Sequence, residues 1–440
     1  MTIETIPEWA CGDRFGIDLP ARSAGLRDGG PEFLTRAFHA SGALPRDNRV
    51  TAITRLDEWN IGGTGAKAML SVAYAREEPG LAHDLFVKFS RNFTDKTRDG
   101  VRFHMEPEVK LANLSRDPAF PVPVPRCVYA DFDHASGTGI LITERIPFGE
   151  GNVEPHHFKC MDQRLPEPLA HYRALIATLA HLSGTHKSGR LGAAAERDFP
   201  FDREALIVDR RNHFDTEQLA IRVDRLVAFV RQYRHLFPAH LAEEPFLASF
   251  RADAPRVVAQ QDAINRHLLA NADMVALCHW NGNIDNAWFW REPDGTLRCG
   301  LIDWGSVGQM PVVQTIWGSL TASEPEFIDA HLPGLIDLFV AEYAAAGGPR
   351  LDRNAVEREL GLHVVTSGLK SLMIAPRAIL SEIPDPSQVA DRFDPLFTVN
   401  ETARVLLKCS VNFLNLWYRH DLGSWLRSGQ FETPEPASAG

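Results

Sequence analysis

The sequence predicts an α+β protein in which a small strand-rich region is followed by a large helical region. Residues 50–146 contain short runs rich in Thr, Ile, Val and Tyr, separated by glycine and proline, which is typical of strands and turns. From about residue 166 onward, Leu, Ile and Ala recur at helical spacing. A chain of 440 residues is too long to fold around a single hydrophobic core, so we expect at least two lobes.

The composition is that of a soluble globular protein and disfavours several classes of partner. The net charge of −11 argues against nucleic-acid binding, which depends on Lys and Arg neutralising phosphates. Six dispersed cysteines without a C-x-x-C pair favour free thiols in a reducing compartment. Met1–Cys11 lacks the basic region and apolar core of a signal peptide, and no apolar run reaches about 18 residues. We therefore expect a cytoplasmic protein that binds no membrane.

The first predicted elements are a helix and a hairpin. Pro31–Gly42 carries apolar residues at helical spacing and ends on glycine, which predicts a short leading helix. Two strand-like runs, 53–59 and 69–74, then flank a glycine-rich tip that contains Gly62, Gly63 and Gly65. This pattern favours a hairpin.

A dinucleotide-binding alternative competes with the hairpin at the same place. Gly63-x-Gly65-x-x-Ala68 fits the loose dinucleotide fingerprint, and Asp84 follows at about the 20-residue spacing of a ribose contact. A Rossmann unit needs a helix after its glycines, but a turn at 77–80 leaves room only for a short one. The hairpin is favoured, a surface turn without a ligand stays open, and an NAD-dependent oxidoreductase is the third functional hypothesis.

The next two charged residues, Lys88 and Glu108, suggest a function only if they form a pair. Lys88 lies alone inside the apolar strand-like run 85–89, where a lone lysine usually faces solvent. Met105–Leu114 is amphipathic, and Glu108 within it could reach back to Lys88. In isolation, Glu108 is better explained as an ordinary exposed side chain.

The lobe boundary is expected close to residue 148. Pro121–Pro125 predicts a rigid extended connector, and two further strands are expected at 126–130 and 139–146. The pattern breaks at 146–151, which leaves the backbone from Glu144 to Ile146 available to an adenine edge. The expected domains are an extension with the leading helix (1–48), an N-lobe (49–147), a helical C-lobe (148–431) and a disordered tail (432–440).

The helical lobe is predicted from the apolar period. Its expected helices are 169–181, 217–233, 258–269, 315–320, 333–346, 355–372 and 402–425.

One stretch concentrates the polar residues that could perform chemistry. Leu277–Trp290, followed by Leu301–Gly305, reads as strand, loop, strand, turn and strand. This arrangement brings Asn281, Asn286 and Asp303 to one end of a hairpin, where their oxygens could converge on a metal-bound phosphate. The stretch therefore predicts a phosphotransfer site.

The order of these motifs resembles the aminoglycoside phosphotransferase and choline/ecdysteroid-kinase-like family of small-molecule kinases. The family's loop reads His-Gly-Asp-x-x-x-x-Asn, and here His279-x-Asn281-x-x-x-x-Asn286 stands in its place. Ile302-Asp303-Trp304 matches the family's later motif. The resemblance implies a protein-kinase-like two-lobed fold with a small antiparallel-sheet N-lobe of five strands and one helix, a hinge, and a large helical C-lobe.

The resemblance also implies roles for individual residues. Lys88, paired with Glu108, would bind the α- and β-phosphates of ATP, and the glycines at 62, 63 and 65 would cover the phosphates. Asn286 and Asp303 would hold Mg²⁺, which needs few protein oxygens because phosphate oxygens complete its shell. His279 would be an architectural hydrogen-bonding residue.

The departure from the family pattern is that Asn281 replaces the catalytic aspartate, and an amide cannot accept the acceptor's proton. Four interpretations compete: Asn281 orients the hydroxyl and proton loss is late; Asp285 takes over as carboxylate; the protein is a nucleotide-binding pseudokinase; or the asparagine is an engineered change. Because Trp280 and Asn283 also depart from the family, a natural variant is favoured. For Asp285, a side chain that faces solvent or caps the loop is favoured.

Two possible transition-metal sites are less favoured. His279 with Cys278 or Asp303 could bind such a metal, but neighbouring strand residues point to opposite faces. His156–Cys160 carries possible ligands without a second cluster in the sequence, so a surface loop is expected.

The leading hypothesis is an ATP- and Mg²⁺-dependent phosphotransferase that acts on a hydroxyl of a small molecule. The acceptor could be cationic, such as an aminoglycoside or a choline-like amine. The alternative is a pseudokinase that acts through protein partners.

Overall fold

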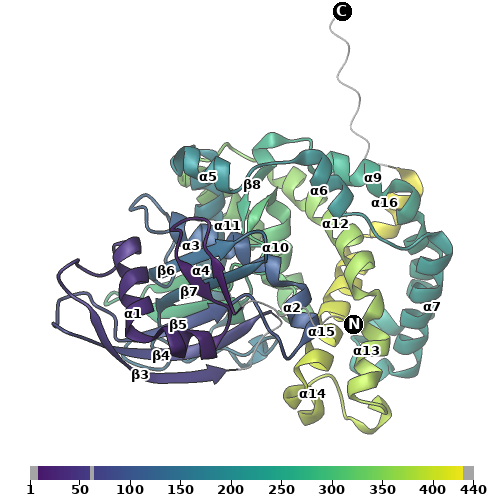
Figure 1. Cartoon of the computed structure of the whole chain (residues 1–440). Helices are drawn as coiled ribbons and strands as arrows, with labels where there is room; N and C mark the ends of the chain where they lie inside the picture. Colours follow the sequence, from purple (N-terminus) through teal and green to yellow (C-terminus); the bar gives the residue numbers. More distant parts are fainter. Residues whose placement is uncertain (1–7, 60–63, 430–440) are drawn as a thin grey trace, which may run out of the picture. The chain divides into compact units, whose positions relative to one another are not determined.

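The computed structural model describes residues 8–59 and 64–429, which form two compact units (Figure 1). The first, called the sheet unit, comprises Met1–Val153, Leu191–Phe199 and Gly300–Gly308. The second, called the helical unit, comprises Glu154–Arg190, Pro200–Cys299 and Gln309–Gly440. The predicted tail at 432–440 lies outside the described residues.

The sheet unit is built on a five-stranded sheet with strand order β3-β4-β5-β7-β6. Every neighbouring pair of strands in it is antiparallel. The strands are β3 (Val50–Trp59), β4 (Ala66–Tyr74), β5 (Asp84–Phe89), β6 (Cys127–Asp133) and β7 (Thr138–Glu144). The predicted hairpin is formed by β3 and β4. A strand and not a helix therefore follows Gly65, which removes the basis for a Rossmann unit.

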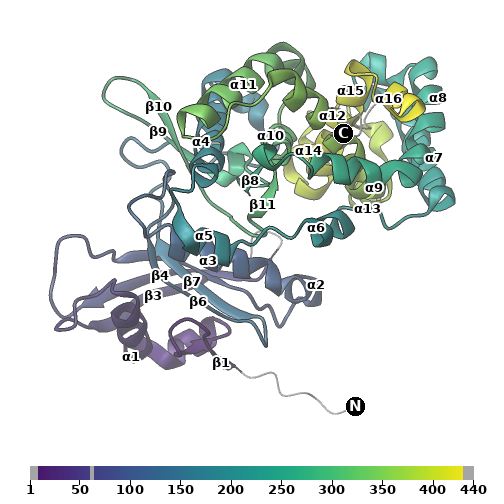
Figure 2. The same ribbon diagram turned by 90° about the horizontal axis from the view of Figure 1, so that it is seen from above.

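The two faces of this sheet are covered by different helices, α1 (Ser23–Ser41) and α3 (Met105–Leu114) (Figure 2). Because side chains alternate along a strand, Val87 and Phe89 enter the core beneath α1, whereas Lys88 points to the α3 face. Its register partner Leu141 belongs to the cluster packed against α3. Alternation thus explains why one lysine interrupts an apolar strand.

The leading helix begins earlier than predicted. α1 starts at Ser23 and contains a non-helical residue, Gly30, before Pro31, so the predicted helix is only its second half. Gly42 ends it with a left-handed backbone, as the sequence suggested. Smaller elements of the sheet unit are β1 (Trp9–Cys11), β2 (Asp18–Pro20), α2 (Lys96–Gly100) and α5 (Gly192–Asp198).

The helical unit contains most of the helices of the chain. They are α4 (Pro168–Lys187), α6 (Arg203–Asp209), α7 (Thr216–Gln232), α8 (Glu244–Asp253), α9 (Val257–Leu268), α10 (Val312–Leu320), α11 (Pro325–Ala345), α12 (Arg353–Ser371), α13 (Ala375–Glu382), α14 (Pro395–Val399), α15 (Glu401–Arg419) and α16 (Leu422–Ser428). Short ladders pair β8 (Val275–Cys278) with β11 (Gly308–Pro311), and β9 (Ala287–Arg291) with β10 (Leu297–Leu301).

Two helix predictions need correction. α11 starts at Pro325, so the predicted start, Pro333, lies inside the helix. The single helix predicted over 402–425 is divided into α15 and α16 at Asp421, which has a left-handed backbone (φ 44°). Apolar spacing alone did not mark this break because the apolar period continues across it.

The predicted α+β fold, with a small antiparallel-sheet unit and a large helical unit, is confirmed. Among residues 8–59 and 64–429, no helix has both the length and the apolar character required to cross a bilayer.

Candidate active site

The centre of the sheet unit is a buried ion cluster around Lys88. Its Nζ donates to Glu108 Oε1 and to Asp303 Oδ1, each at 2.7 Å. The side chains of Lys88 and Glu108 are only 12% and 7% exposed, whereas that of Asp303 is 45% exposed. The predicted contact between Lys88 and Glu108 is therefore confirmed, and Asp303 joins it on the solvent side.

This cluster keeps Lys88 charged. Burial disfavours the ammonium, but the carboxylates of Asp303 and Glu108 raise the pKa of Lys88 above its usual value. The backbone N–H of Trp304 also donates to Glu108 Oε1, at 3.3 Å. The Lys88 ammonium can donate to a phosphate oxygen, and the partly exposed Asp303 carboxylate can hold a cation that accompanies the phosphate.

The segment that carries Asp303 is fixed inside the sheet unit. Leu301 N–H donates to Pro123 O and Ser306 N–H donates to His104 O, both at 3.0 Å. Asp303 itself has a left-handed backbone (φ 61°), which non-glycine residues rarely adopt and which costs about 1–3 kcal/mol. In this backbone conformation the Asp303 carboxylate accepts a hydrogen bond from Lys88.

A second lysine lies beside the first and was not predicted. Lys67 on β4 is the register partner of Lys88 on β5, so both point to the α3 face. Burial, and then the nearby charge of Lys88, lower the pKa of Lys67 to about 8. Its Nζ donates to Thr64 O at 3.1 Å. The available signal in the sequence was its position directly after the glycine-rich tip.

Gly65 occupies a position that no other residue fits. Its φ of +53° favours glycine, and a Cβ there would lie 1.9 Å from Phe89 O. The carbonyl of Gly65 accepts from Asn92 Nδ2 at 3.3 Å. The other two predicted glycines, Gly62 and Gly63, lie outside the described residues.

The predicted adenine edge follows the end of β7. Glu144 N–H donates to Arg126 O, and Ile146 O accepts from Phe148 N–H, each at 3.0 Å. These two backbone groups are therefore used within the sheet unit. A role for the segment from Glu144 to Ile146 in binding adenine stays a prediction.

The polar loop of the helical unit connects β8 to β9, and His279 is its buried anchor. The His279 carbonyl accepts from Thr315 Oγ1 on α10 at 2.6 Å, and its Nδ1 accepts from Asn281 N–H at 3.3 Å. α10 approaches the loop so closely that a Cβ at Gly318 would lie 1.9 Å from Trp280 O. His279 thus has the architectural geometry expected of it.

The adjacent thiol does not suit the alternative of a metal site at His279. Burial raises the pKa of Cys278 to about 12, although a hydrogen bond with Ser183 opposes this. A thiol must lose its proton to ligate a metal. Cys278 instead lies 3.3 Å from Ser183 Oγ inside the helical unit.

Three asparagines hold the loop through amide hydrogen bonds. Asn283 Nδ2 donates to Asn281 Oδ1 at 2.6 Å, and Asn286 Nδ2 donates to the Asn281 carbonyl at 2.8 Å. Thr321 Oγ1 donates in turn to Asn283 Oδ1 at 3.2 Å. With Oδ1 engaged by Asn283, the Asn281 side chain presents its Nδ2 group, which is a donor and not a base.

Of the two orientations expected for Asp285, facing solvent or capping the loop, the structure contradicts the first. Its side chain is only 10% exposed, and Oδ2 lies 3.6 Å from Lys159 Nζ. The backbone carbonyl of Asp285 also accepts from His156 Nε2 at 2.9 Å. Asp285 therefore points into the helical unit and links the loop to the segment at 156–159.

The two predicted Mg²⁺ ligands offer oxygen donors in separate units. Asp303 supplies a partly exposed carboxylate in the sheet unit. Asn286 is buried in the helical unit, and because its Nδ2 is used internally, its Oδ1 is the atom suited to a cation. A carboxylate and an amide oxygen are the hard ligands that Mg²⁺ prefers, so the donor types fit.

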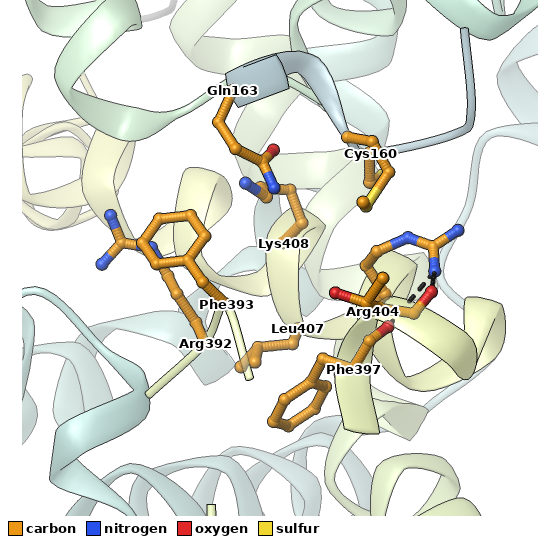
Figure 3. Close-up of a pocket in the computed structure, with 10 residues that line it drawn as sticks. Cys160, Gln163, Arg392, Phe393, Phe397, Arg404, Leu407 and Lys408 are labelled. Atoms are coloured by element: carbon orange, nitrogen blue, oxygen red, sulfur yellow. Dashed lines mark hydrogen bonds between the residues drawn. The ribbon is translucent and has the colours of Figure 1, made fainter. Parts of the chain in front are cut away.

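Cationic and aromatic side chains make up half of the lining of a small pocket in the helical unit (Figure 3). Its lining includes Arg392, Phe393, Arg404 and Lys408. Arg404 donates to the carbonyls of Phe397 and Thr398, and Lys408 forms an ion pair with Glu324. The cavity measures about 10 Å³, room for about one water molecule, so it is too small for a sugar.

Comparison with known proteins gives similarity in solved structures alone. No family model matches the sequence, and no curated protein matches it. A choline/ethanolamine kinase family protein from Mesorhizobium loti is 12% identical with a TM-score of 0.41, over 89% of this chain and 98% of that one. In fold, the chain is similar to small-molecule kinases.

Two further structures have comparable values. A choline kinase from Cryptosporidium parvum Iowa II is 13% identical with a TM-score of 0.42, over 85% of this chain and 93% of that one. A spectinomycin phosphotransferase, solved with ADP and spectinomycin, is 11% identical with a TM-score of 0.39, over 84% and 94%. Because these values are low, any assignment of activity rests on the residues of this chain.

The buried ion cluster predicts a difference between two glutamates of α3. Glu108→Ala removes a charged hydrogen bond to Lys88 and should lower the free energy of unfolding by about 2 kcal/mol. Glu106→Ala removes partly exposed pairs with Lys110 and His134 and should cost about 1 kcal/mol or less. Urea unfolding of both variants measures the difference, and equal losses would contradict the assignment of Glu108.

Proposed function

We propose that this protein is an ATP- and Mg²⁺-dependent phosphotransferase that moves the γ-phosphate to a hydroxyl of a small molecule. The observation that carries the proposal is the Lys88 cluster, a buried ammonium held by Glu108 and by the partly exposed Asp303. A lysine fixed in this way supplies a point charge to phosphate oxygens, and its side chain does not have to reorient during the reaction.

The surroundings of Lys88 support phosphate binding. Lys67 lies on the same sheet face, and its lowered pKa means that its positive charge is disfavoured where it stands. The causes are burial and, second, repulsion by the charge of Lys88. The negative charge of a bound polyphosphate would offset both. Gly65 lets the backbone pass within contact of Phe89 at the same end of the hairpin, where the phosphates would be covered.

In the proposed reaction, the acceptor oxygen forms a bond to the γ-phosphorus as the bond from that phosphorus to the bridging oxygen breaks, and ADP leaves with the electron pair. The acceptor proton passes to solvent. Asn281 would donate a hydrogen bond from Nδ2 to the acceptor oxygen and so orient it. Asn286 and Asp303 would hold Mg²⁺, which neutralises phosphate charge.

The absence of a carboxylate at residue 281 sets the expected rate. Phosphoryl transfer depends mainly on positioning and charge neutralisation, whereas a general base typically contributes about 10²–10⁴-fold. Asp285 lies against Lys159 within the helical unit, so we assign it to positioning the loop. The expected enzyme is active but slow.

A pseudokinase is the second candidate, and Asn281 is the observation that favours it. The hydrogen bond from Asn283 to Asn281 Oδ1 gives the loop a stable amide arrangement without any base. Such a protein would bind the nucleotide and act through a partner.

Titration of the protein with ATP and with NAD, each with and without Mg²⁺, tests the proposal. ATP binding that strengthens with Mg²⁺ is expected, followed by a phosphorylated product from a panel of small hydroxyl compounds. Asp303→Ala should abolish the Mg²⁺-dependent turnover. Tight NAD binding without ATP binding would overturn the proposal, and ATP binding without any product would favour the pseudokinase.

Restoring a carboxylate at residue 281 should accelerate the reaction. Asn281→Asp supplies the missing proton acceptor, so kcat should rise by up to about 10²-fold, the lower end of general-base contributions. Steady-state kinetics with the best acceptor measure the change, and the exposed Asn354→Asp is the matched control. A fall in kcat at unchanged ATP affinity would show that the amide itself is required.

The lowered pKa of Lys67 predicts that ATP binding depends on pH. Phosphates favour the charged lysine, so the complex has a higher Lys67 pKa than the free protein. The affinity should therefore be complete below pH 8 and fall as the pH rises through about 8, the pKa of Lys67 in the free protein.

Calorimetric titration in buffers of different ionisation enthalpy measures the proton uptake that accompanies ATP binding. Uptake near pH 8 should disappear in Lys67→Met. If this variant takes up as many protons as the wild type, Lys67 is not next to the phosphates.

A further inference from the structure

Three side chains of the helical unit converge in a way that the phosphotransfer proposal does not use. His171 Nε2 lies 2.8 Å from Glu154 Oε2, and His157 Nε2 lies 3.0 Å from the same oxygen. The three potential ligand atoms all lie within 4.8 Å of one another. Two imidazole nitrogens and one carboxylate oxygen thus face a common point.

The hydrogen bonding of His171 fixes which ring nitrogen faces Glu154. Its Nδ1 lies 2.8 Å from the backbone carbonyl of Glu167, which can only accept, so Nδ1 carries a proton. In neutral imidazole Nε2 is then a lone pair, and it faces the Glu154 carboxylate. Either a proton or a metal cation between Nε2 and the carboxylate oxygen would satisfy both groups.

The surroundings of the cluster are those of a supported metal site. Ligating histidines commonly donate their other ring N–H to a backbone carbonyl, as His171 does to Glu167. The side chain of His171 is fully buried, and Phe289 packs against it with ring centroids 4.8 Å apart. His157 and Glu154 are each about one fifth exposed, which leaves an entry path for an ion and a water ligand.

We propose that Glu154, His157 and His171 form a binding site for a divalent transition metal of the Zn²⁺ type, with water as fourth ligand. Two imidazoles and a carboxylate are a common Zn²⁺ donor set, whereas Mg²⁺ and Ca²⁺ prefer all-oxygen sites. With bonds of about 2.0–2.2 Å, a tetrahedral ion spaces its ligand atoms about 3.4 Å apart, so the two His–Glu separations would widen slightly and ligand atoms as far apart as 4.8 Å would move closer. Small side-chain rotations of the partly exposed Glu154 and His157 provide that.

The site would fasten the segment at 154–159 to the polar loop of the helical unit. Glu154 N–H donates to Phe289 O on β9 at 2.8 Å, and β9 follows directly after Asn286. At the other end of the segment, Lys159 pairs with Asp285. A bound metal would thus restrain the segment at 154–159, which contacts β9 through Glu154 and the polar loop through Lys159. This inference is independent of the proposed phosphotransfer.

Zinc titration of the untagged full-length protein, first stripped with a chelator, tests the inference. Competition with a chromophoric chelator should give one tight equivalent of Zn²⁺ and a higher melting temperature with the ion. Glu154→Gln and His157→Gln should each weaken binding at least about tenfold, since losing even outer-shell partners costs that much. The control is His181→Gln, which removes an exposed His–Glu pair from the same helix α4 and should bind Zn²⁺ normally.

Two further measurements keep the result independent of folding. Circular dichroism establishes that Glu154→Gln and His157→Gln are folded, and both residues are exposed enough to tolerate the change. Nitrogen NMR of the wild type should show Zn²⁺ bound at Nε2 of two histidines. Failure to bind one equivalent, or unchanged binding in both variants, would overturn the site.

Discussion

The structure around the proposed nucleotide site depends on one interaction, the ion cluster of Lys88, Glu108 and Asp303. It joins β5, α3 and the segment at 300–308, three parts of the chain that are distant in sequence. A buried ammonium between two carboxylates stays charged, and removing Lys88 would leave the buried Glu108 carboxylate without a compensating charge. The same geometry that stabilises the sheet unit keeps a positive charge ready for phosphate.

Much of this cluster could be predicted from local patterns. A period of two placed Lys88 in a strand, and a period near 3.6 placed Glu108 on a helix, so their meeting required only that the helix cover one sheet face. The contacts of Asp303 and Lys67 were harder to predict from the sequence. The pairing of Asp303 with Lys88 depends on packing across more than two hundred residues, and the role of Lys67 depends on strand register, which sequence specifies weakly at a glycine-rich hairpin.

In the polar loop, the position of the backbone was predictable from the sequence but the directions of the side chains were not. Its position between two strands was predictable from apolar runs, whereas the architectural role of His279 stays a prediction from the family resemblance. The direction of Asp285 was not, because a loop side chain is oriented by distant partners such as Lys159. The role of Asn283, which donates a hydrogen bond to Asn281 Oδ1, is also visible only in the structure.

The Glu154, His157 and His171 cluster illustrates the same point for metal ligands. His157 lies in an irregular segment and His171 on α4, so no single helical or strand period relates them. The sequence had therefore suggested only a surface loop at 156–160. Tertiary packing against Phe289 supplies the second histidine that the loop lacks.

The central claim, that the Lys88 cluster binds the phosphates of ATP, is tested most directly by calorimetric titration of Lys88→Met with ATP and Mg²⁺. Lys110→Met, an exposed lysine on α3, is the control. Loss of a charged hydrogen bond should weaken ATP binding by about 10- to 100-fold in Lys88→Met, while Lys110→Met binds as the wild type does. ATP affinity unchanged in a folded Lys88→Met protein would contradict the account.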